Sequence, residues 1–171
     1  MDKARCIVES GYEVNTSDED WLGSGVYFFV DGFACPKSNA KEWALFKYHG
    51  CNPCVVASEV LVSPEKVLDL RDASGLYIYN EARARILSEN YESLLKRRDL
   101  SKKKRRDIRL DDAIVTRKVV SLLNVSVLFH NLYIKNKIHR GLELESSYPN
   151  STVCCVADPN LIVRSWVVER Y

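Results

Sequence analysis

Trp21-Leu22-Gly23-Ser24-Gly25-Val26-Tyr27-Phe28-Phe29 is the most informative stretch of this sequence. The β-branched and aromatic residues from Gly25 to Val30 predict a buried strand. The two glycines before this strand let the backbone approach a ligand closely, and the ring of Tyr27 can then serve as a stacking face. The stretch therefore predicts a strand that begins beside a binding cleft.

A second large ring follows on a predicted helix. Ser38 is a good N-cap for a helix that runs to about Tyr48, and Trp43 lies in its mostly apolar stripe. Tyr27 and Trp43 could enclose a flat ring such as nicotinamide. Aromatic residues beside glycine in a buried strand are more often core residues, so the pattern alone leaves both interpretations open.

Together these two segments resemble the ADP-ribosyltransferase superfamily. The poly(ADP-ribose) polymerase signature reads G-x-G-I-Y-F, and bacterial relatives read W-x-G-x-G-I-Y-F-F followed by A-x-x-W-A. The matching residues here are Trp21, Gly23, Gly25, Val26, Tyr27, Phe28 and Phe29, then Ala40, Trp43 and Ala44. Looser matches to later blocks follow in the same order, at Leu68-Asp69-Leu70, Asp112 to Val115, Arg140-Gly141 with Glu145, and Val153 to Ile162.

The resemblance implies a fold and a substrate. The fold is α+β, with split antiparallel β-sheets and flanking helices in a single domain of residues 1–171. The substrate is NAD, with Tyr27 stacked on the nicotinamide and Trp43 packed on or beside that ring. The other residues assigned to NAD binding are Gly23, Ser24, Gly25 and Phe28.

The resemblance also implies a reaction. Members of the superfamily break the bond between ribose and nicotinamide through an oxocarbenium-like state, which a carboxylate stabilises. The residues assigned to this chemistry are Tyr27, Arg140 and Glu145. Glu145 is the candidate carboxylate, because the bacterial pattern places a glutamate after Arg-Gly. Glu143 is a lower-ranked candidate, and a solvated acid at a strand end is an equally good interpretation of Glu145.

Two departures from the family pattern leave the activity open. Bacterial relatives carry H-G-T on a first strand that should precede Cys6, and the sequence begins too late to contain it. The catalytic Glu or Gln of the family opens the penultimate strand, where this chain has Val153. We therefore expect an NAD-dependent mono-ADP-ribosyltransferase acting on a macromolecular acceptor, as a toxin or defence effector with an antitoxin or immunity partner. The alternative is a degenerate fold that binds a nucleotide or a partner.

The order of the predicted elements favours an α+β fold over the regular alternation of a parallel nucleotide-binding fold. Strands are predicted at 25–30, 54–62, 67–70, 125–134, 141–144, 153–157 and 161–168, and helices at 3–10, 38–48, 77–95 and 110–123. Neither G-x-G-x-x-G nor G-x-x-x-x-G-K-S/T occurs in the sequence.

Composition excludes a membrane protein and a disulfide scaffold. No stretch approaches the ~20 apolar residues that a membrane span needs. The six cysteines lie in a chain long enough to build its own core, so reduced thiols in the cytoplasm are expected. Cys51 and Cys54 have the spacing of zinc ligands, but no second pair accompanies them, and no metal site is predicted.

Positive charge is concentrated in one segment. Nine Lys and Arg residues lie between Lys96 and Arg109 against Asp99 and Asp107, which gives a local charge of +7 in a chain of net charge +2. Such a run gains counterion-release energy on nucleic acid, although most charge runs are solvated faces. Nucleic-acid contact through this segment is therefore a further expectation.

Overall fold

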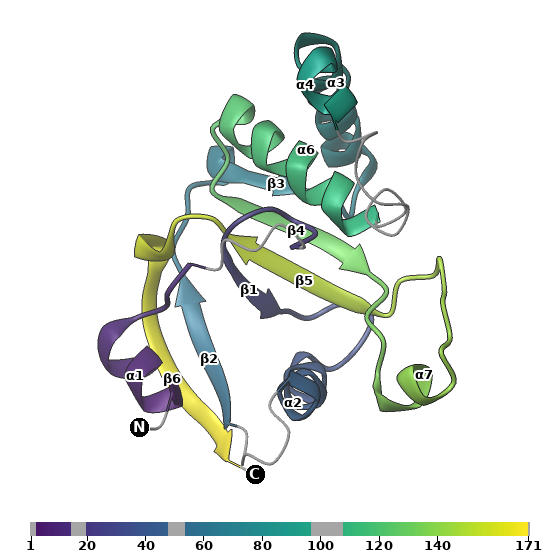
Figure 1. Ribbon diagram of the computed structural model, residues 1–171. Coiled ribbons are helices and arrows are strands. Elements are labelled where there is room, and N and C mark those ends of the chain that lie inside the picture. The colour runs from purple at the N-terminus through teal and green to yellow at the C-terminus, as the bar shows by residue number, and fades with distance from the viewer. Residues whose placement is uncertain (1–2, 15–19, 48–53, 97–107, 171) are drawn as a thin grey trace.

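The computed structural model describes residues 3–14, 20–47, 54–96 and 108–170, and its strands form two separate sheets (Figure 1). The larger sheet has the strand order β1-β5-β4-β3, and the smaller one pairs β2 with β6. Their bounds are β1 (Val26–Phe29), β2 (Cys54–Val60), β3 (Val67–Asp69), β4 (Val127–Leu132), β5 (Ser151–Val156) and β6 (Ile162–Arg170). The predicted α+β class is confirmed.

One strand pair departs from the predicted antiparallel arrangement. The strands β3 and β4 run parallel, whereas the other pairs are antiparallel. Parallel neighbours need a long crossover, and here it is helical, made of α3 (Ala73–Glu89), α4 (Tyr91–Leu95) and α6 (Ile108–Leu123). In Figure 1, α3 and α6 lie on one side of the larger sheet.

The remaining helices lie at the other end of the molecule. They are α1 (Lys3–Ser10), which contacts β6 and β2, α2 (Pro36–Lys47), which follows β1, and α7 (Lys137–Gly141), which lies between β4 and β5 in the chain. Gly11 ends α1 with a φ of 84°, a left-handed conformation typical of a helix C-terminus. Across the described helices, none combines the length and apolarity that crossing a bilayer requires.

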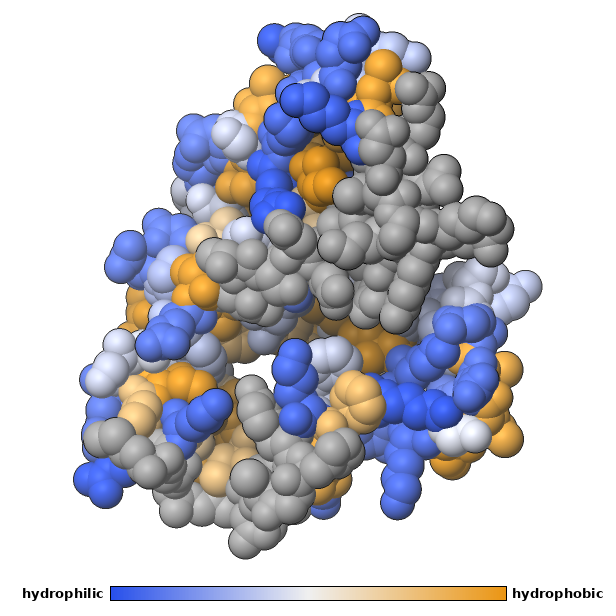
Figure 2. All heavy atoms as spheres, in the orientation of Figure 1, coloured by the Kyte–Doolittle hydropathy of each residue, from blue (hydrophilic) through white to orange (hydrophobic). Residues whose placement is uncertain are grey.

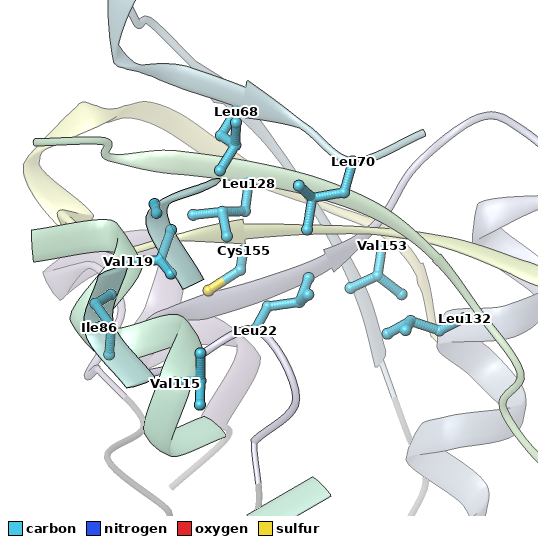
Figure 3. Close-up of a cluster of buried hydrophobic side chains, with 11 residues drawn as sticks. Leu22, Leu68, Leu70, Ile86, Val115, Val119, Leu128, Leu132, Val153 and Cys155 are labelled. Atoms are coloured by element: carbon cyan, nitrogen blue, oxygen red, sulfur yellow. The ribbon is translucent and has the colours of Figure 1, made fainter. Parts of the chain in front are cut away.

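A hydrophobic cluster covers each face of the larger sheet. The first cluster includes Leu128, Cys155 and Val119 and fills the space between the sheet and the helices α3 and α6 (Figure 3). The second is built around Val127, Cys154 and Val156 on the opposite face. The neighbouring cysteines of β5 therefore point to opposite sides, as the period of a strand predicts.

This placement predicts a large difference in thiol reactivity. Burial raises the pKa of Cys154 and of Cys155 to about 12, whereas hydrogen bonds with Ser38 lower the pKa of the exposed Cys35 thiol. Because the thiolate is the reactive form, we expect iodoacetamide at pH 8 to alkylate Cys35 first and to leave Cys154 and Cys155 unmodified. Mass spectrometry of time points measures this. The control is the chain in guanidinium, where all three should react, and comparable native rates for Cys35 and Cys155 would contradict the prediction.

Two predicted helices differ from the observed ones. The helix α2 begins at Pro36, two residues before the predicted N-cap Ser38, and the N–H of Asn39 donates to the carbonyl of Cys35 at 3.1 Å. None of its residues is fully buried: of the predicted apolar stripe, Ala40 and Ala44 are half-buried, while Trp43 and Lys47 are exposed. The predicted helix 77–95 starts earlier and divides at Asn90, which caps α3 and precedes α4.

The predicted strand 141–144 is wrong. The helix α7 ends at Gly141, and the chain then turns through Glu143, whose φ is 51°. The cause lies upstream, where the side chain of Asn136 accepts a hydrogen bond from the N–H of His139 at 2.9 Å and so caps α7. Arg140 therefore lies on a helix, and Glu143 and Glu145 lie in the loop that follows it.

Candidate functional site

A cavity of about 560 Å³ lies between α2, α7 and the end of β1. This volume is within the range of small-molecule sites. The lining residues come from three parts of the chain: Phe29, Phe33, Ala34, Ser38, Asn39, Glu42 and Trp43, then Ile134, Lys135, Asn136, His139 and Arg140, and finally Pro149, Asn150 and Ser151.

A hydrogen-bond network fixes the base of the cavity. The amide of Asn150 bonds to both backbone groups of Ile134, accepting from its N–H at 2.9 Å and donating to its carbonyl at 3.0 Å. Ser151 donates to the side-chain oxygen of Asn150 at 3.1 Å and accepts from the side chain of Asn39 at 3.1 Å. These bonds join β5, the segment after β4 and α2, so the cavity rests on rigid elements rather than on loops alone.

Trp43 of α2 and Arg140 of α7 meet on one side of the cavity, with Phe46 beside them outside its lining. The guanidinium carbon of Arg140 lies 3.5 Å from the ring centroid of Phe46 and 6.0 Å from that of Trp43. The two rings are 6.1 Å apart and tilted by 52°. Desolvation lowers the pKa of Arg140, and the Glu42 carboxylate nearby opposes that shift. This side therefore offers a stacking surface next to a cation and a carboxylate.

A histidine of α7 also lines the cavity. His139 stacks on Tyr133, with ring centroids 5.5 Å apart and an interplanar angle of 24°. The structure gives no hydrogen-bond partner for the buried Nδ1 atom of His139. An unpaired buried nitrogen is costly, and this one has almost no accessible surface, so it does not contribute to the open face of the cavity.

Tyr27 does not line this cavity. Its hydroxyl donates to the carbonyl of Gly23 at 2.6 Å and accepts from the N–H of Leu22 at 2.9 Å, and its ring packs against the first hydrophobic cluster. Burial raises the pKa of this hydroxyl far above its usual value. Phe29, two residues along the same strand face, lines the cavity instead. The core and the loop thus occupy the ring and the hydroxyl of Tyr27, and its role in stacking on nicotinamide stays a prediction.

The glycines of the motif serve packing within the protein. A Cβ atom on Gly25 would lie 2.6 Å from the sulfur of Cys155, and one on Gly23 would lie 3.1 Å from Cγ of Arg117. The absent side chains thus let the loop with Ser24 approach β5 and α6. Phe28 points to the other face of the sheet, where it packs against the second cluster. Gly23, Ser24, Gly25 and Phe28 do not line the cavity, and their role in NAD binding stays a prediction.

The predicted carboxylate is also outside the cavity. Glu145 pairs with Lys135, and 80% of its side chain is exposed. Val153, at the position of the family's catalytic acid, is buried in the first hydrophobic cluster (Figure 3). Glu42 is the one carboxylate among the described residues that line the cavity. Of the residues predicted from sequence, the structure brings Trp43 and Arg140 together in this site.

Several sequence-based predictions fall on residues outside the described ranges. They concern Cys51 and the basic segment after Lys96, up to residue 107. Cys54 is a free thiol. Within the part of the chain that the structure describes, no three His, Cys, Asp or Glu side chains are grouped so that they could hold a metal ion.

Glu42, Asn39 and His139 were missed at the sequence level. A detectable signal existed for the first two, because Asn39, Glu42 and Trp43 are spaced i, i+3 and i+4 and so share one face of α2. His139 had a weaker signal in the Asn136 cap three residues before it. Comparisons of the chain with models of protein families, with curated proteins and with solved structures found no match. Membership of the ADP-ribosyltransferase superfamily therefore stays a prediction from the motifs.

Proposed function

We propose that this chain binds NAD in the cavity between α2 and α7 and transfers ADP-ribose to a macromolecular acceptor. The observation that carries the proposal is the meeting of Trp43 and Arg140 in one cavity. They come from two different blocks that resemble ADP-ribosyltransferases and are almost 100 residues apart in the chain. Residues from distant blocks are expected to line the same cavity if they bind one ligand. Residues that only pack in the core need not do so.

The chemistry of the cavity lining fits the two ends of NAD. Nicotinamide is flat and can stack on Trp43, while the diphosphate is anionic and can pair with Arg140 and Lys135. His139 also lines this cavity, next to Asn136 and Arg140. The site is thus a mostly preformed pocket with a few polar groups, as small-molecule sites usually are.

In the proposed reaction the bond between ribose C1 and the nicotinamide nitrogen breaks, and its electron pair leaves with nicotinamide. The positive charge that develops on the ribose is stabilised by the carboxylate of Glu42, which replaces the sequence-based candidate Glu145. A nucleophile of the acceptor then bonds to C1 and loses its proton to solvent. The products are free nicotinamide and the ADP-ribosylated acceptor.

The alternative is a domain that binds NAD or a partner without catalysis. The burial of the apolar Val153 at the family's acidic position favours it, as does the ion pair that holds Glu145 away from the cavity. The two functions differ in one outcome. Both predict NAD or partner binding, but only the transferase releases nicotinamide.

Labelled NAD tests the proposal directly. The chain is incubated with NAD carrying label in its adenylate part, together with cell extract, and nicotinamide is measured by chromatography. We expect labelled macromolecule and free nicotinamide in equal amounts. Binding of NAD without either product would support the non-catalytic alternative, and absence of binding would reject both NAD-dependent functions.

A further inference from the structure

Exposed aromatic rings gather beside cations at the mouth of the cavity. Phe33, Trp43 and Phe46 are 60%, 41% and 42% exposed. Arg140 stacks over Phe46, and the Nζ atom of Lys47 lies 5.9 Å from the centroid of Trp43. We refer to these five residues, Phe33, Trp43, Phe46, Lys47 and Arg140, as the α2–α7 platform.

The surroundings of the α2–α7 platform are strongly basic. The helix α2 carries Lys37, Lys41 and Lys47, and residues 133–141 carry Lys135, Lys137 and Arg140. The same two segments carry six cationic residues and one acidic residue, Glu42. Glu145, in the loop after α7, pairs with Lys135. The chain as a whole has a net charge of only +2, so the positive charge here is a local property. Figure 2 shows orange and blue residues side by side over the part of this face where α7 lies.

We infer that the α2–α7 platform binds single-stranded nucleic acid, with bases stacked on its rings and phosphates held by its cations. Unpaired bases present flat faces that stack on Trp, Phe and the guanidinium plane of Arg. The phosphates of the same strand require cations at the edge of those rings, which Lys47 and Arg140 supply. The lysines around the platform argue against a protein partner, because Lys is depleted at protein interfaces, whereas aromatic residues and Arg occur in both kinds of interface.

This binding does not need the NAD reaction. If the proposed function holds, the bound strand is also the acceptor, because the α2–α7 platform adjoins the cavity that contains Trp43. The inference about acceptor class therefore rests on the proposed function, while strand binding itself is tested without NAD. Each can fail while the other stands.

The test is fluorescence anisotropy of the full chain with a labelled 12-nucleotide single strand and the matched duplex, in the absence of NAD. We expect the single strand to bind at least tenfold more tightly than the duplex, because a duplex hides its base faces. Phe46→Ala and Lys47→Ala should each weaken single-strand binding about tenfold. Lys47 does not line the cavity, and its removal leaves Arg140 stacked on Phe46, so Lys47→Ala should retain NAD binding.

Matched variants keep the test specific. Tyr77→Ala removes a ring that is also largely exposed but lies on α3, and it should leave affinity unchanged. Raising salt from about 50 to 200 mM should weaken binding about 20-fold if about three phosphates are contacted. Circular dichroism melting shows whether each variant is folded.

Three results would overturn the inference: equal affinity for single strand and duplex, unchanged affinity in folded Phe46→Ala, or no strand binding. If alanine substitutions at Lys102 to Arg106 alone abolish binding while Phe46→Ala has no effect, the basic segment is the binding site and the α2–α7 platform is not.

Discussion

Glu42→Gln is expected to lower the rate of ADP-ribose transfer about 100-fold, with little change in NAD affinity. Glutamine keeps the size and hydrogen-bonding reach of the side chain and removes its negative charge. A charge that stabilises the oxocarbenium-like ribose acts mainly in the transition state, so its loss should appear in kcat rather than in binding. Release of nicotinamide under single-turnover conditions, with calorimetry for affinity, separates the two quantities.

Glu145→Gln is the matched control for this substitution. It removes the carboxylate that the sequence motif favours, but in the structure that carboxylate pairs with Lys135 at an exposed position. We expect a change of less than about threefold in rate, because exposed ion pairs contribute little. A large loss in Glu145→Gln with normal activity in Glu42→Gln would show that the motif identifies the carboxylate and the cavity does not.

Gly75→Ala is expected to lower the free energy of unfolding by about 3 kcal/mol. Gly75 lies in the first turn of α3, and a Cβ atom there would be 1.7 Å from the backbone carbonyl oxygen of Asp69 at the end of β3. Because the opposing atom is backbone, the helix must move away from the strand. That movement also strains the cap, in which the N–H of Gly75 donates to Asp72 at 2.7 Å.

Thermal unfolding measures this prediction, with an expected fall in Tm of about 6–12 °C for a domain of this size. Gly141→Ala is the control, since a Cβ atom on Gly141 would meet nothing within 4 Å. That variant should differ from the native chain by at most about 1 kcal/mol, the ordinary helix preference for alanine. Equal melting temperatures for the two variants would contradict the packing of α3 against β3.

The sequence was sufficient for those elements whose pattern is local. Alternation placed Cys154 and Cys155 on opposite faces of one strand, and Gly11 marked the end of α1 because a left-handed residue is needed there. The strand predicted at 141–144 was wrong, because these residues follow a short helix that depends on the Asn136 cap. One side-chain hydrogen bond there outweighs the propensity of several residues.

The candidate site was predictable only in part, for a similar reason. Trp43 and Arg140 were found because they belong to motifs. Tyr27 belongs to the strongest motif, yet the core and the loop backbone use its ring and its hydroxyl. Glu42 and His139 join the site through the packing of α2 against the segment between β4 and β5. Helical spacing places Glu42 on the same face of α2 as Trp43, but it does not show which distant segment packs there.

Titration calorimetry with NAD on the native chain, Trp43→Ala and Tyr27→Phe is the most direct measurement. The cavity between α2 and α7 predicts micromolar affinity for the native chain and at least about tenfold weaker binding for Trp43→Ala, because stacking and buried ring surface are lost. It predicts nearly native affinity for folded Tyr27→Phe, whose missing hydroxyl bonds to the loop backbone and to the buried Cys155 and not to the cavity. No heat at millimolar NAD, or a loss of affinity in Tyr27→Phe and not in Trp43→Ala, would contradict it.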